Sequence, residues 1–251
     1  MKNKFLIPCI ALLAAGSLLT SCKKSGVSSV ASANSQLAFG LQTDSASTNL
    51  AFAPATGLPA PLGGSTRALS TAPTVAWTSG IANISGFKFE AKKKGLNIEV
   101  VSHNVAHVDL FAVATSLTNV TIDTGTYKEI EIRVTFTKTT TADLPLVLKG
   151  TFTTQGGAAV PIELDFNDNA EVRAEADNVV VDGKTDITTI VKLHLNRLFR
   201  GITSAALDQA TRTNGTIVIS ATSNTTFYDQ ISHNITSCGE SEGFEKHEKR
   251  K

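Results

Sequence analysis

Hydrophobic and polar residues alternate along most of this chain with the two-residue period of a β-strand. The clearest stretch is TYKEIEIRVTFT at 126–137. One face of this segment would carry Ile130, Ile132, Val134 and Phe136, and the other Glu131, Arg133, Thr135 and Thr137. Such a two-faced pattern is typical of an antiparallel sheet that covers a core on one side and meets water on the other.

Further alternating segments, bounded by Gly, Pro, Asn or Asp, follow one another at the spacing of an all-β protein. A first strand is predicted around Leu37, Phe39 and Leu41, and we interpret 74–92 as one long strand with a bulge at Gly86. The other predicted strands lie at 96–100, 107–113, 117–122, 126–137, 144–154, 160–166, 170–176, 187–199 (ending in a turn) and 215–222.

Helical features are confined to the end of the chain. SAALDQAT at 204–211 predicts a short helix. Asn224 is expected to cap a last helix over 225–235, in which Phe227, Ile231 and Ile235 recur every four residues.

Together these elements predict an all-β chain, an antiparallel β-sandwich of the immunoglobulin or transthyretin kind with a short C-terminal helix. We assign the sandwich to residues 35–236, with a long loop at 44–73 that is rich in Pro, Gly, Ser and Ala. Residues 237–251 are charged and aperiodic, so they predict a disordered tail.

The N-terminus has the features of a secretory signal over residues 1–21. Two lysines precede an apolar run that is shorter than the ~20 residues of a membrane-spanning helix. Leu19-Thr20-Ser21-Cys22 resembles the lipobox of bacterial lipoproteins, and the resemblance implies cleavage before Cys22 and lipid attachment to its sulfur. An ordinary signal-peptidase site near a cysteine is the alternative. Two or more acyl chains anchor stably, so the membrane is an expected partner.

The same resemblance implies a place in the cell envelope, anchored to the outer membrane. Residues 22–34 are small and polar and predict a flexible tether. Lys23-Lys24 replace the acidic cluster associated with surface export in Bacteroidetes-type cells. This favours the periplasmic face and leaves the cell surface open.

Cysteine usage leaves Cys238 without a partner for an intramolecular disulfide. Cys9 would leave with the signal and Cys22 would become a thioether. Cys238 is therefore predicted to be a free thiol in the tail or a site of intermolecular pairing.

Two short motifs resemble a β-sandwich family of unknown function that is common in lipoproteins of Bacteroidetes-type bacteria. They are VDLF at 108–111 and GTYKEIEIR at 125–133, and the C-terminal ISATSNTTFYDQISHNI is similar to closing segments of such lipoproteins. The resemblance covers roughly residues 75–236 and implies fold and compartment, but no catalytic residues. From the residues themselves, Gly125 should supply a turn and the Tyr127 hydroxyl should reach a backbone group.

Charge and motifs argue against nucleic-acid binding and catalysis. The chain has 23 Lys and Arg against 22 Asp and Glu, a net charge of +1, so no clustered basic surface or nucleic-acid partner is expected. It lacks G-x-S-x-G, H-E-x-x-H, Walker and C-x-x-C motifs. We predict no enzyme activity and no catalytic residues.

Candidate metal ligands are sparse. On a strand, His103 and His107 would lie ~13 Å apart, too far to share one zinc, which leaves only His107 with Asp109. The stretch at 165–169 matches the first half of a calcium loop, but Ala170 and Ala176 stand where the loop requires Gly and Glu. A good hairpin turn explains the same residues. No cofactor is expected beyond weak calcium binding through the oxygens of Asp165, Asn167, Asn169 and Glu171.

Two features of the sequence bear on glycans: candidate aromatic residues for sugar binding and a candidate O-glycosylation site. A sugar-binding site would need exposed aromatic rings, for which Trp77, Tyr127 and Tyr228 are the candidates, although Trp77 is expected in the core or at its rim. Asp44-Ser45-Ala46 resembles the O-glycosylation acceptor of these bacteria, which makes Ser45 a predicted modification site.

The sequence therefore favours a non-catalytic, lipid-anchored envelope protein with a binding or structural accessory role and an unknown protein or glycan partner. A fimbrillin-like subunit that assembles by strand exchange after cleavage at Arg67 is the first alternative. An envelope hydrolase is the second.

Overall fold

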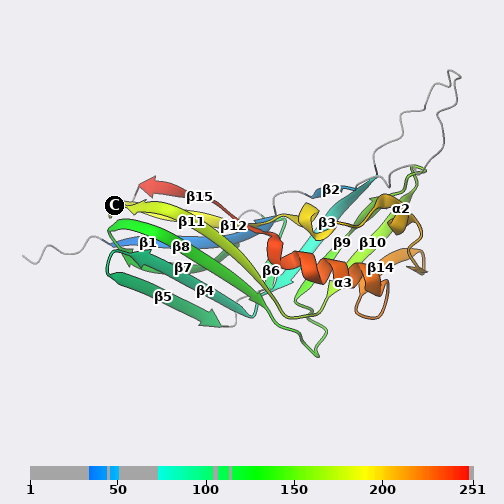
Figure 1. Ribbon diagram of the computed structural model, residues 1–251, viewed down its shortest axis with the longest axis horizontal. Helices are drawn as coiled ribbons and strands as arrows, with labels where there is room; N and C mark the ends of the chain where they lie inside the picture. The colour runs from blue at the N-terminus through cyan, green and yellow to red at the C-terminus, as the bar shows by residue number, and fades with distance from the viewer. Residues whose placement is uncertain (1–33, 44–45, 51–72, 104–106, 113–114, 249–251) are drawn as a thin grey trace, which may run out of the picture. The chain divides into compact units, whose positions relative to one another are not determined.

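Three β-sheets account for most of the described chain, and the predicted all-β sandwich class is confirmed. The computed structural model describes residues 34–43, 46–50, 73–103, 107–112 and 115–248 (Figure 1). All of them belong to one compact unit, residues 32–251.

The sheets are named I, II and III here. Sheet I has the order β15 (Gly239–Glu248), β12 (Thr185–Leu193), β1 (Asn34–Thr43), β7 (Thr115–Asp123). Sheet II has the order β13 (Arg212–Thr213), β14 (Thr216–Ser220), β10 (Ala159–Phe166), β9 (Leu146–Thr153), β3 (Thr74–Asn83), β2 (Ser47–Asn49), and β6 (His107–Asp109) also pairs with β3. Sheet III has the order β11 (Ala170–Val181), β8 (Gly125–Phe136), β4 (Gly86–Lys93), β5 (Leu96–His103).

Sheets I and III face each other across an aromatic core. The ring of Phe39 on β1 lies 5.1 Å from that of Phe87 and 5.2 Å from that of Phe89, both on β4. All three side chains are essentially inaccessible to water, and burial of each contributes roughly 1.5–3 kcal/mol. Two strand pairs, β1–β12 and β10–β14, are parallel, so sheets I and II are mixed, whereas every pair in sheet III is antiparallel.

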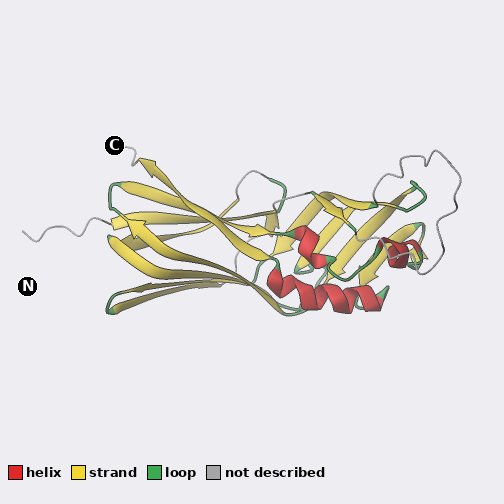
Figure 2. Ribbon diagram, turned by 45° about the horizontal axis from the view of Figure 1, so that its top comes forward, coloured by secondary structure: helices red, strands yellow, loops and turns green. Residues whose placement is uncertain are grey.

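The helices pack against sheet II (Figure 2). They are α1 (Leu195–Leu198), α2 (Ser204–Asp208) and α3 (Thr225–Asn234). The 3₁₀ turn η1 (Ile235–Ser237) lies against β11 of sheet III. Tyr228 of α3 stacks on Phe166 with ring centroids 6.0 Å apart, and Phe199 after α1 contacts Trp77 at 5.7 Å. Gly150 lies opposite Trp77, where a Cβ would overlap the Ala76 carbonyl oxygen.

Residues 74–92 form two strands, so the prediction of one long strand is wrong. The chain leaves sheet II after Asn83 and enters sheet III at Gly86. Between them, the backbone N–H and the hydroxyl of Ser85 both donate to the Thr135 carbonyl, at 2.9 and 3.0 Å. The bulge lies instead between Trp77 and Ser79. The buried positions slip by one residue between Ile84 and Phe87, a break that a bulge within one strand would also produce.

The predicted disordered tail is also wrong for residues 237–248, which continue η1 and form β15. This strand pairs antiparallel with β12 from Leu193–Gly239 to Thr185–Glu248. Its sequence, GESEGFEKHE, shows no apolar alternation because β15 is an edge strand held by backbone hydrogen bonds. The sandwich therefore extends beyond residue 236.

Asn224 precedes α3 as predicted, but its side chain does not cap the helix. It lies in the left-handed region at φ 50°, and its amide instead bonds the backbone of Thr211 and Val218 at 2.8–3.0 Å. The helix over 204–208 is confirmed. The Tyr127 hydroxyl donates to the Asp123 carbonyl at 2.8 Å, and Gly125 has a φ of 146°, both as expected.

Candidate functional site

The outer surface of sheet III carries a dense array of charged side chains. We call it the charged face: Lys88, Glu90, Lys92, Glu99, Glu129, Glu131, Arg133, Glu171, Arg173 and Glu175. These residues point outward because the intervening positions, such as Phe87, Phe89, Ile132 and Val134, are buried in the sandwich. The alternation read from 126–137 is confirmed at every position from 130 to 136 except that Glu131 is itself covered.

Strand register sorts seven of these ten charged residues into two adjacent rows across the sheet. The cationic row runs Arg173, Arg133, Lys88, Val101, and the acidic row runs Glu175, Glu131, Glu90, Glu99. Like charges directly opposite each other on neighbouring strands are destabilising. The arrangement is therefore stable only because each row neutralises the other.

Ion pairs join the two rows. Lys88 Nζ lies 2.8 Å from Glu90 and 3.3 Å from Glu99. Arg173 lies 2.6 Å from Glu131 and 2.8 Å from Glu175, and Arg133 bonds Glu131 as well. Glu131 thus sits between two guanidinium groups, and only 4% of its side chain is exposed.

The pKa values of three groups on this face are displaced away from neutral pH. Burial raises the pKa of Glu131, but hydrogen bonds from Arg133 and Arg173 outweigh it and hold that pKa below 4.5. A hydrogen bond to Glu90 raises the pKa of Lys88 above 10.5 and lowers the pKa of Glu90 in return. Near neutral pH these groups are charged, and they are suited to electrostatic recognition rather than to proton transfer.

A shallow hollow of about 250 Å³ lies at one end of the charged face. Gly86 forms part of its wall, and Lys88, His103, Thr135 and Glu171 contribute polar groups. A Cβ at Gly86 would meet Thr135 at 3.6 Å, an ordinary contact, so the hollow could be narrowed there without strain. Hydroxyl, ammonium and carboxylate groups around it suit a small polar ligand.

The four predicted calcium ligands are not brought together as a calcium loop. Asp165 lies on β10 in sheet II, whereas Glu171 lies on the charged face 3.7 Å from Arg133. Asn167 pairs with both backbone groups of Thr139 at 2.9 and 3.0 Å, and the Asn169 side-chain oxygen accepts from the Lys138 N–H at 2.9 Å. The two amides therefore hold the β8–β9 connection.

Other predicted ligands are also engaged in local structure. His107 Nδ1 lies 3.0 Å from the Asn83 side-chain oxygen, and Asp109 accepts the Phe111 N–H at 2.9 Å. Burial, and next the Glu163 carboxylate, raise the pKa of Asp165. In the described ranges, no three His, Cys, Asp or Glu residues are grouped in a way that could hold a metal ion.

The candidate sugar-binding aromatics lie in the core. Trp77, Tyr127 and Tyr228 are 3%, 0% and 5% exposed, so none of them offers a ring to a glycan. Trp77 is in the core, as its strand position suggested.

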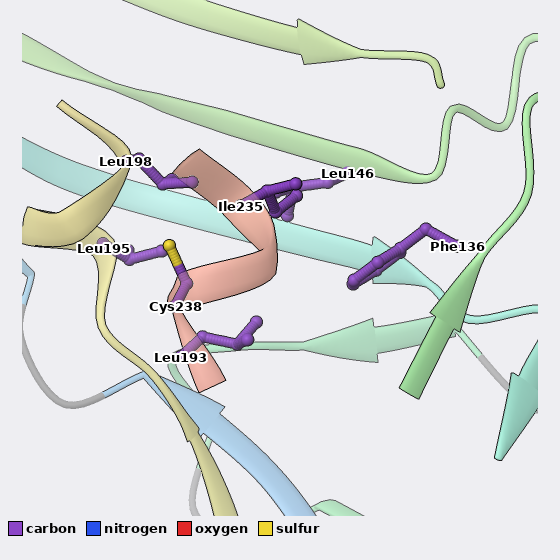
Figure 3. A pocket seen from close by; sticks show the side chains of 7 residues that line it. All are labelled: Phe136, Leu146, Leu193, Leu195, Leu198, Ile235 and Cys238. Carbon is purple, nitrogen blue, oxygen red and sulfur yellow. The ribbon is translucent and has the colours of Figure 1, made fainter. Parts of the chain in front are cut away.

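Cys238 is buried rather than in a mobile tail, so that part of its prediction is wrong. Its side chain is 1% exposed and lines a small apolar void with Phe136, Leu146, Leu193, Leu195, Leu198 and Ile235 (Figure 3). The void measures about 10 Å³, at the lower limit for one water molecule and without polar partners for it. An intermolecular disulfide at Cys238 would require local opening.

Cys22, Ser45 and Arg67 lie outside the described residues, as do the signal peptide and most of the tether. In the part of the chain that the structure describes, no helix is long and apolar enough to cross a membrane. The charged face itself was missed at the sequence level, where its residues were interpreted as solvated strand faces. The signal was present in the matched charge alternation of KFEAK, EIEIR and EVRAE.

Comparisons with known proteins add little. No protein-family model matches the chain, and no curated protein is similar to it. A solved structure, MbnP from Methylosinus trichosporium, is similar over 66% of this chain and 77% of its own, with 13% identity and a TM-score of 0.30. This similarity is too weak to support an inference about fold or function.

Proposed function

We propose that this chain is a non-catalytic lipoprotein of the cell envelope, anchored through Cys22, which presents the charged face as a binding surface. The observation that carries the proposal is Leu19-Thr20-Ser21-Cys22 directly after an apolar leader. An outer-membrane position, on the periplasmic face, is part of the proposal.

The start of the fold is consistent with such an anchor. β1 begins at Asn34, and only residues 23–33 separate it from Cys22. A segment of that length would keep the sandwich close to the membrane surface.

The charged face supports binding rather than chemistry. Its acids and bases are paired with one another, and the pKa values of Lys88, Glu90 and Glu131 are displaced away from neutral pH. A catalytic acid or base works best with a pKa near the working pH. A partner that matches the two charge rows would bind in a salt-dependent way.

Metabolic labelling with a fatty acid tests the anchor. The wild-type chain should take up label and remain with the membranes after a high-salt wash. Cys22→Ser should take up none and appear in the soluble fraction, whereas Cys238→Ser, the matched control, should behave like wild type. Labelling of Cys22→Ser to the wild-type level would overturn the proposal.

A second candidate is a fimbrillin-like subunit, favoured by the position of β1. This strand lies inside sheet I between β12 and β7, so its removal would leave an open slot for a donor strand. Cleavage after Arg67 would separate β1 from the rest of the chain. A mature N-terminus at residue 68 together with ladders of polymers on a gel would support this function, and an intact chain from Cys22 would refute it.

A further inference from the structure

β5 is an unprotected edge strand. Among the described strands it pairs with β4 alone, and Figure 1 shows it at the lower margin of its sheet. Its eight residues pair with β4 without any register shift. Natural edges are usually blunted by shortness, a bulge, charged side chains (lysine above all) or proline, because a free row of N–H and C=O groups recruits other strands. Of these features β5 has only one acidic side chain, Glu99.

The other described edges are blunted. β2 and β13 have three and two residues. β7 and β15 each carry a register shift against their neighbours. The edge of β11 is covered by β15, where the Ser241 hydroxyl donates to the Glu175 carbonyl at 2.6 Å. Two of the three exposed large hydrophobic residues in the described chain, Leu96 and Val101, lie on β5.

The β4–β5 hairpin determines which groups face outward. Lys93 and Leu96 are paired across a two-residue turn, which makes them a hydrogen-bonded pair. Even-numbered residues of β5 therefore bond β4, and Asn97, Glu99, Val101 and His103 direct their backbone N–H and C=O groups away from the sheet. Their side chains all lie on the outer surface, in line with the charged face.

We propose that β5 pairs antiparallel with β5 of a second copy of this chain, with the two-fold axis at Val100. Outward groups must meet outward groups, which leaves four registers with at least five facing residues. The register with its axis at Ile98 has only five, and it continues the acidic row into the mixed row of Asn97, Lys92 and Glu129. The other three place Glu99 of one copy opposite Glu99, Glu99 opposite Val101, or Val101 opposite Val101 of the other copy.

The two charge rows select the middle register. There the acidic row of one copy, ending in Glu99, continues into the cationic row of the second copy, which ends in Val101. The first register joins two acidic rows and opposes two Glu99 carboxylates directly. The third joins two cationic rows. Only the middle register makes opposite charges continuous, twice per dimer.

The inner surface fits the same register. Val100 meets Val100 of the second copy at the axis, and Ile98 meets Ser102. Ile98 and Val100 are only partly covered in one copy, although they pack against the core. Pairing would bury them further and extend sheet III into a continuous eight-stranded sheet. The proposal does not depend on the lipid anchor.

Cysteine cross-linking in isolated envelopes tests the register. Val100→Cys should give a disulfide-linked dimer of the full chain on mild oxidation, because residues at the axis of a non-hydrogen-bonded pair lie close together. Glu99→Cys and Val101→Cys report the other two registers and should give little. Wild type, with Cys238 buried, is the background control. Cross-linking through residue 99 or 101 in place of 100 would overturn the charge argument, and none at any position in folded protein would overturn the pairing.

Sedimentation of the detergent-extracted protein tests the charges without relying on Val100. Val101→Glu would face Glu99 of the second copy twice and should weaken the dimer by about 2- to 30-fold. Val101→Lys would face the same carboxylates and should keep or strengthen it. Val180→Glu, equally exposed on β11, is the matched control and should change nothing. A monomeric wild type, or equal weakening by both Val101 variants, would refute the proposal.

Discussion

Replacement of Glu131 by glutamine removes one negative charge from the centre of the charged face, with little change in shape. The wild-type carboxylate is 4% exposed and bonds two arginines. A hydrogen bond to a charged group contributes about 1.5–3 kcal/mol. Arg133 and Arg173 are 30% and 49% exposed and would be hydrated by water in the variant. The loss of each hydrogen bond is therefore counted at about half of that free energy.

Two effects reduce the loss further. The glutamine oxygen can still accept one bond, and the repulsion from Glu90 and Glu175 on either side is relieved by roughly 0.2–1 kcal/mol each. One lost bond at that reduced value, less the relieved repulsion, leaves a decrease of at most about 1 kcal/mol in the free energy of unfolding of Glu131→Gln at pH 7. Urea unfolding, followed by far-ultraviolet circular dichroism, measures this directly.

The effect should depend on pH in one direction. Because the pKa of Glu131 in the folded chain lies below 4.5, the ionised group stabilises the fold above that value. The advantage of wild type over Glu131→Gln should disappear as the pH falls below about 4.5 through the folded pKa. Glu99→Gln, on the same face but 56% exposed, is the control and should leave stability unchanged. A loss well above 1 kcal/mol for Glu131→Gln at pH 7, or a difference that grows on acidification, would refute the reasoning.

Other parts of the fold give sharper structural predictions. Tyr127→Phe should lose about 1 kcal/mol of stability in urea, since it removes the buried hydroxyl bond to the Asp123 carbonyl; an unchanged midpoint would contradict that bond. Gly150→Ala should cost about 3 kcal/mol or more, or prevent folding, because its Cβ overlaps the Ala76 carbonyl. Gly156→Ala, whose added Cβ would have its nearest neighbour at 3.8 Å, should leave stability unchanged. Thermal unfolding of the two variants measures both effects. Cys238 should resist alkylation in the native protein and react after unfolding; rapid native labelling would argue against the β12–β15 pairing.

The strands were largely predictable because burial on one face imposes a two-residue pattern that survives in the sequence. The segments around Leu37, Ile130 and Ile162 show it, and each is a strand with those side chains in the core. The same reasoning failed at 74–92, since the slip in the alternation between Ile84 and Phe87 fits a bulge as well as it fits one strand ending at Asn83 and another beginning at Gly86. Which sheet a strand joins is a long-range property.

Edge strands and polar clusters were less predictable for a related reason. β15 is held by backbone pairing, which does not require apolar side chains. Its charged sequence therefore predicts a disordered tail although it forms a strand. By spacing alone, Asn167 and Asn169 fit a metal-binding loop as well as a turn. Their hydrogen bonds to the backbone of residues 138 and 139 show that they have a structural role. The two charge rows depend on the register of four strands, which come from three separate parts of the chain: the β4–β5 hairpin, β8 and β11.

The most direct test of the lipoprotein account is the mass of the N-terminal peptide of the native protein, purified from membranes in detergent. The account predicts a peptide that begins at Cys22 and carries the mass of a diacylglyceryl group and an N-acyl chain. A peptide that begins at Cys22 or elsewhere without lipid, or one that retains the leader at residues 1–21, would contradict it.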